Sequence, residues 1–88
     1  MPRTATSVTA NSYVASILRS AREAAGLTQS ELAERLDVSP AYVQKVEAGK
    51  ANLTIGQLAR FAEALGAFLQ LELKPLPAEE PFLERLLQ

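Results

Sequence analysis

The sequence contains no cysteine and no histidine, and Asp37 is its only aspartate. The absence of cysteine excludes disulfide bonds, thiol nucleophiles and cysteine-ligated metal sites. The absence of histidine removes the side chain most often used for acid–base catalysis. The remaining residues offer no acid–base pair or nucleophile arrangement, so we expect no enzyme, no catalytic residue, no metal and no cofactor.

Long apolar runs and a strong net charge are also missing. No run approaches the length that crosses a bilayer, and the first ten residues lack the apolar core of a signal peptide. We therefore expect a cytoplasmic protein with no membrane partner. Nine basic and ten acidic residues leave a net charge of −1. Composition alone therefore does not indicate nucleic-acid binding, which usually comes with a basic patch.

The residues that are present favour a small helical domain. A chain of 88 residues is long enough for one domain. Hydrophobic residues make up 48% of it but aromatic residues only 6%, with 15 alanines and 14 leucines. Alanine and leucine are the best helix formers, so this mixture favours closely packed helices.

The first ten residues show no helical periodicity, and we expect a flexible N-terminal arm over 1–10. Asn11 or Ser12 then begins a first helix that Gly26 ends. Its apolar residues recur at helical spacing and predict one buried stripe. They are Val14, Ile17, Leu18, Ala21 and Ala25.

Three further helices are marked by their capping residues. Thr28 with Glu31 and Thr54 with Gln57 have the spacing of capping boxes, which predicts helices over 28–36 and 54–65. Ser39 followed by Pro40 predicts another helix over 39–48, because proline fits the first helical position.

The pattern changes to an alternating one after Gly66. Leu69, Leu71 and Leu73 alternate with polar residues, which predicts a half-buried strand over 67–75. An isolated strand leaves its backbone groups unpaired, so we expect it to pair with the same segment of a second copy in a two-fold homodimer. The alternative is an extended segment that covers the core of its own chain. Residues 76–88 then form a C-terminal tail, in which apolar residues at 82–87 allow a short helix.

Two short helices separated by about three residues fit a helix-turn-helix, whose second helix enters the DNA major groove. The sequence here resembles the Xre/Cro–repressor helix-turn-helix family. The resemblance rests on the run Arg22-x-x-x-Gly26-Leu27-Thr28-Gln29-x-x-Leu32-Ala33-x-x-Leu36-x-Val38-Ser39-x-x-x-Val43-x-x-x-Glu47-x-Gly49. It implies a mainly α, lambda-repressor-like bundle of four to five helices, with the DNA-binding domain over 11–66. Asp37 departs from the pattern, because the family usually has glycine there.

The resemblance also assigns candidate site residues. It implies DNA contact by the two helix starts, the outward face of the third helix and the loop after it. These residues are Thr28, Gln29, Ser39, Pro40, Ala41, Tyr42, Gln44, Lys45, Lys50 and Asn52. Lys45 is expected to read a base. Tyr42 is expected to reach a phosphate or base edge, or else to pack against the turn between the second and third helices. The family's Arg–Glu pair corresponds to Arg22 and Glu47, which we interpret as structural.

The stretch 64–75 resembles antitoxins of the HipB and HigA type, in which a helical domain is followed by a dimerisation strand. That resemblance implies a protein that binds a cognate toxin and represses its own operon. The expected homodimer places two third helices in successive major grooves, so we expect the DNA operator of this repressor to be an inverted repeat. Two alternatives stay open. The chain could be a stand-alone phage or metabolic repressor, or a protein-interaction module with weak DNA binding, which its net charge and Asp37 allow.

Overall fold

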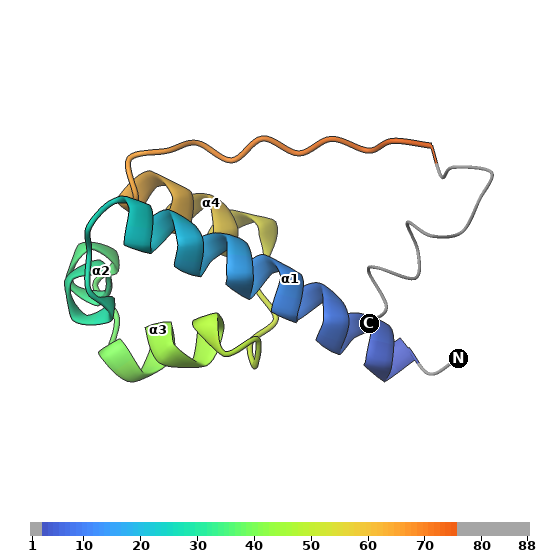
Figure 1. Ribbon diagram of the computed structural model, residues 1–88, viewed down its shortest axis with the longest axis horizontal. Helices are drawn as coiled ribbons and strands as arrows, with labels where there is room; N and C mark the ends of the chain where they lie inside the picture. Colours follow the sequence, from blue (N-terminus) through green and yellow to red (C-terminus); the bar gives the residue numbers. More distant parts are fainter. Residues whose placement is uncertain (1–2, 76–88) are drawn as a thin grey trace.

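The computed structural model describes the backbone of residues 3–75 and the side chains of residues 10–75. Four helices follow one another along this part of the chain: α1 (Arg3–Ala24), α2 (Gln29–Leu36), α3 (Pro40–Glu47) and α4 (Ile55–Ala64). The long α1 runs across the molecule, with α2 and α3 on one side of it and α4 behind (Figure 1). No helix in this part of the chain combines the length and apolar character that a membrane span needs.

The first helix begins earlier than the sequence pattern predicts. It spans 22 residues from Arg3, so residues 3–10, expected as part of a flexible arm, continue the helix instead. No glycine or proline interrupts the chain between Arg3 and Ala24. Once a helix has formed, adding residues to its end costs little, even where they lack an apolar stripe. Residues 1 and 2 lie outside the described part.

The predicted helix starts are confirmed at α2, α3 and α4. The Thr28 hydroxyl accepts the backbone N–H of Glu31 at 3.0 Å, and the Glu31 carboxylate accepts that of Thr28 at 2.8 Å. Thr54 and Gln57 repeat this reciprocal arrangement at α4. Ser39 accepts the backbone N–H of Tyr42 at 3.1 Å. Each bond satisfies an N–H that the helix itself leaves without a partner.

The turn between α2 and α3 passes through Asp37 in a left-handed conformation, with φ 58° and ψ 47°. It is the one non-glycine residue with positive φ among those described. Aspartate tolerates this region better than most residues. The N–H of Val38 donates to the Ala33 carbonyl at 3.0 Å and closes the turn. The turn between α2 and α3 therefore forms without a glycine at this position.

The core lies where the four helices meet. Its buried residues come from every helix, and Leu32 and Val43 have no measurable exposure. The core cluster comprises Leu18, Leu32, Ala33, Leu36, Val43, Val46 and Phe61. Because Val43 and Val46 hold one side of α3 in this core, the opposite side of α3 is turned to solvent.

Residues 67–75 leave α4 and run alongside α1 outside regular secondary structure (Figure 1). The predicted strand is thus absent from the described part of this single chain, which offers it no strand to pair with. Leu69 is half-buried, whereas Leu71 is 62% exposed and Leu73 fully exposed. The segment therefore covers little of its own core. The predicted tail, residues 76–88, lies outside the described residues.

Candidate nucleic-acid interface

The exposed side of α3 carries four of the ten residues expected to meet DNA. Pro40, Ala41, Gln44 and Lys45 are exposed, and Ser39 is exposed at the start of the helix. With eight residues, α3 is about 12 Å long. Gln44 and Lys45 supply the long hydrogen-bonding side chains of this surface. Pro40 and Ala41, at the N-terminal end of α3, are short and apolar. The major groove of B-DNA is wide enough to admit such a helix.

A partly buried ion pair joins the C-terminal end of α3 to α1. The Nε of Arg22 donates to Oε2 of Glu47 at 2.7 Å, and its Nη2 donates to Oε1 at 3.0 Å. The Arg22 side chain is 11% exposed and that of Glu47 only 3%. The hydrogen bonds to Glu47 raise the pKa of Arg22 above its ordinary value, against the opposing effect of burial. The guanidinium therefore stays charged, and the pair sets how α3 projects from the domain.

The same pair extends into α2 and the turn before it. Nη1 of Arg22 donates to the carbonyl of Leu27 at 2.6 Å. The side-chain amide of Gln29 donates to Oε1 of Glu47 at 3.0 Å. One carboxylate thus joins α1, α2 and α3. Gln29, expected at a phosphate, faces this network and is half-buried.

At the start of α2, side chains of the helix itself accept hydrogen bonds from backbone N–H groups that could otherwise bind a phosphate. The Glu31 carboxylate already accepts the N–H of Thr28, and Thr28 accepts the N–H of Glu31. The hydrogen bond from the Thr28 backbone lowers the pKa of Glu31 below its ordinary value, with a further contribution from the Thr28 side chain. The capping box therefore uses two donors of this helix end and leaves a carboxylate beside them.

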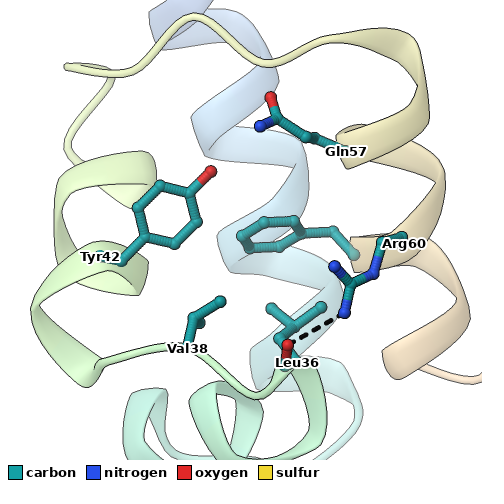
Figure 2. Close-up of a pocket in the computed structure, with 6 residues that line it drawn as sticks. Leu36, Val38, Tyr42, Gln57 and Arg60 are labelled. Carbon is teal, nitrogen blue, oxygen red and sulfur yellow. Dashed lines mark hydrogen bonds between the residues drawn. The ribbon is translucent and has the colours of Figure 1, made fainter.

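Tyr42 is half-buried and packs against the core, so its DNA contact and its packing on the turn between α2 and α3 both stay predictions. Its ring lies 6.3 Å from that of Phe61, centroid to centroid, with 48° between the planes. Tyr42 lines a small pocket of about 240 Å³ together with Val38, Gln57 and Arg60 (Figure 2). Arg60 donates from Nη2 to the Leu36 carbonyl at 3.0 Å and so ties α4 to the end of α2.

The loop after α3 is held by α1 through a contact that the sequence does not predict. Asn11 donates to the side-chain oxygen of Asn52 at 2.6 Å. Gly49 has φ +75°, and a Cβ there would lie 3.1 Å from the Ser12 hydroxyl oxygen. Lys50 is exposed beside this anchor. Asn11 and Asn52 are 41 positions apart, and no pattern in a single sequence indicates that they meet.

Comparison with known proteins identifies the domain. Residues 18–67 match the family described as helix-turn-helix. The chain is 37% identical over 54 residues to the HTH-type transcriptional regulator RamB of Mycobacterium tuberculosis, from strains CDC 1551 / Oshkosh and ATCC 25618 / H37Rv alike. The match covers 61% of this chain but only 11% of each relative. No solved structure gives a significant match. The family match covers the core and both helices of the α2–turn–α3 unit, and the chain therefore belongs to the helix-turn-helix family.

Proposed function

We propose that this chain is a sequence-specific transcriptional repressor that reads DNA bases with the exposed side of α3. The observation that carries the proposal is the division of α3 into a buried side, Val43 and Val46, and an exposed side that presents Gln44 and Lys45. A lysine ammonium suits the O6 and N7 atoms of guanine, and a glutamine amide suits the N6 and N7 atoms of adenine. Ala41 is short enough to pack against a thymine methyl group.

Backbone contacts in this proposal come from both ends of the helix-turn-helix. Lys50 and Asn52 lie on the loop anchored by Asn11, and Ser39 and Thr28 lie at helix starts. Gln29 contacts a phosphate by moving its amide from Glu47. The Arg22–Glu47 bonds do not depend on that amide. Affinity is expected to fall as salt rises, because these contacts release counterions from the DNA.

A binding measurement on the DNA upstream of the gene tests this proposal. Lys45→Ala is expected to remove about 1–3 kcal/mol of preference for the cognate duplex over a scrambled one. Arg19→Ala removes the same charge from the exposed side of α1 and is expected to leave that preference unchanged. Equal loss of preference in both variants, or no preference in the wild type, would contradict base reading by α3.

We further propose a homodimer joined through residues 67–75. The support is the exposure of Leu71 and Leu73 on an extended segment without a strand partner in the described part of the chain. Antiparallel pairing with a second copy satisfies the backbone groups of both segments. Two α3 helices about 34 Å apart would then meet successive major grooves, so the operator is expected to be an inverted repeat. Sedimentation measures this directly: the wild type is expected to dimerise, and Leu71→Asp to reduce dimerisation.

The biological role that we propose is that of an antitoxin, which represses its own operon and binds a toxin. Its support is the resemblance of residues 64–75 to the HipB and HigA type. A second candidate, a regulator without a toxin partner, is favoured by the relatives, which are named as transcriptional regulators. Co-expression with the neighbouring gene distinguishes the two. An antitoxin is expected to relieve growth arrest caused by that gene and to co-purify with its product, whereas a stand-alone regulator does neither.

A further inference from the structure

An apolar groove lies between α1, α4 and the segment that follows α4. Its volume is about 530 Å³, and Glu72 is the one charged residue among the described residues that line it. The helix residues on its walls include Tyr13, Ile17, Ala21, Leu58, Ala62 and Leu65, and residues 67–72 form the third side. The groove therefore offers a binding surface for an apolar partner.

Several large apolar side chains on the walls of this groove are exposed to solvent. Tyr13 and Ile17 of α1 are 58% and 51% exposed, and Phe68 of the segment is 81% exposed. A contiguous apolar surface of this kind on a small protein usually has a partner. None of these residues belongs to α3, so the surface is separate from the proposed DNA contact.

We propose that the chain's own C-terminal segment, residues 82–87, docks in this groove as a two-turn helix. Phe82, Leu83, Leu86 and Leu87 fall on one side of a helix, and Glu84 and Arg85 fall on the other. Pro81 precedes them at the position where proline favours a helix start. So short a helix is marginal alone in water and is stabilised by packing its apolar side.

The dimensions of the groove agree with this occupant. From Tyr13 to Ala21 the wall formed by α1 is about 12 Å long, and a helix over 82–88 is about 10 Å long. Residues 67–75 run back alongside α1 (Figure 1). The six residues 76–81 span at most about 20 Å when fully extended, which allows the chain to fold back onto the groove.

The connection to the rest of the chain favours this occupant over a free partner. A short tether holds the tail near the groove at an effective concentration in the millimolar range. In the proposed dimer a second copy pairs with the edge of the extended segment, which leaves the groove to be filled from the same chain. Docking would also hold Leu69 and Leu71 in place, because they line the groove with the helices.

Engineered disulfides in the full 88-residue chain test the proposal, because the sequence has no cysteine of its own. Ile17→Cys is combined with Leu83→Cys in one variant and with Leu86→Cys in another, so that either direction of the docked helix is detected. Matched controls place the first cysteine at Ser16, an exposed neighbour that does not line the groove. Disulfides require Cα atoms within about 7 Å.

At least one Ile17 pair is expected to form an intramolecular disulfide about tenfold or more faster than its Ser16 control, because docking raises the local thiol concentration. The advantage should disappear in denaturant. Equal rates for both Ile17 pairs and their controls would overturn the proposal. A disulfide that forms between two chains would also overturn it, since a second copy would then fill the groove. Neither result bears on DNA binding by α3.

Discussion

The ion pair between Arg22 and Glu47 permits the sharpest stability prediction. Glu47→Ala removes the acceptor of three hydrogen bonds, two from Arg22 and one from Gln29. It also leaves the guanidinium, only 11% exposed, without its counterion. Removal of one partner from a fully buried pair costs about 3–5 kcal/mol, because the remaining charge stays desolvated. This pair is partly buried, so we expect a loss near the lower end of that range. The total free energy of unfolding of a domain of this size is only about 5–15 kcal/mol.

The assay is thermal and urea unfolding followed by circular dichroism. A loss of 3 kcal/mol corresponds to a fall in Tm of about 12–24 °C for a domain of this length. Glu34→Ala is the matched control, because Glu34 is exposed on α2, and its Tm is expected to change by only a few degrees. The loss of stability in the double variant Arg22→Ala/Glu47→Ala should be smaller than the sum of the losses in the two single variants, because neither charge remains without its partner.

The ratio of affinities for cognate and scrambled DNA separates a structural role from a role in base reading. At a temperature where Glu47→Ala remains folded, this ratio is expected to stay near that of the wild type. If Glu47→Ala unfolds at the same temperature as the wild type, the pair does not hold α3 in place and the reasoning from burial is wrong.

Three further predictions concern Glu31, Asp37 and Gly49. Hydrogen bonds lower the pKa of Glu31 in the folded chain, so its ionised carboxylate stabilises the fold above pH 4.5, and this contribution is lost as the pH falls through the lower pKa of the folded chain. The free energy of unfolding, measured with urea between pH 6 and pH 3, should depend less on pH in Glu31→Gln than in the wild type. An equal pH dependence in both proteins would contradict the role of Glu31. Asp37→Gly should raise stability by about 1 kcal/mol, because glycine adopts φ 58° without steric cost; a lower Tm would show that the aspartate side chain stabilises the turn. Gly49→Ala should lower the free energy of unfolding by about 1–3 kcal/mol, because of the positive φ and the close approach of Ser12. Gly26 has a similar φ but open space around it, so Gly26→Ala should lose less stability. Equal losses of stability in the two variants would rule out the Ser12 contact as a cause.

Local signals in the sequence predict most of the helical domain. The reciprocal bonds of Thr28 with Glu31 and of Thr54 with Gln57 involve residues three apart, so their spacing alone indicates the helix starts. Leu32 and Val43 belong to apolar stripes of helical period and lie in the core. The start of α1 escapes this reasoning, because residues 3–10 have neither a capping signal nor an apolar stripe.

The functional surface is harder to predict, because it depends on contacts between distant parts of the chain. The amide of Gln29 lies on Glu47, 18 positions away, and Tyr42 packs on Phe61 of another helix. Neither contact leaves a periodic signal. The Arg22–Glu47 pair follows from resemblance to a family and not from spacing. The extended segment 67–75 has a clear alternating pattern, but a strand needs a partner, and residues 3–75 offer none.

In the function proposed above, two α3 helices of one dimer read successive major grooves. A hydroxyl-radical footprint of the full chain on the DNA upstream of its gene tests this most directly. We predict two protected half-sites in inverted orientation, with centres about 10 base pairs apart on one side of the duplex, and loss of both in Lys45→Ala. Protection of one isolated half-site, or a footprint that Lys45→Ala leaves intact, would contradict it.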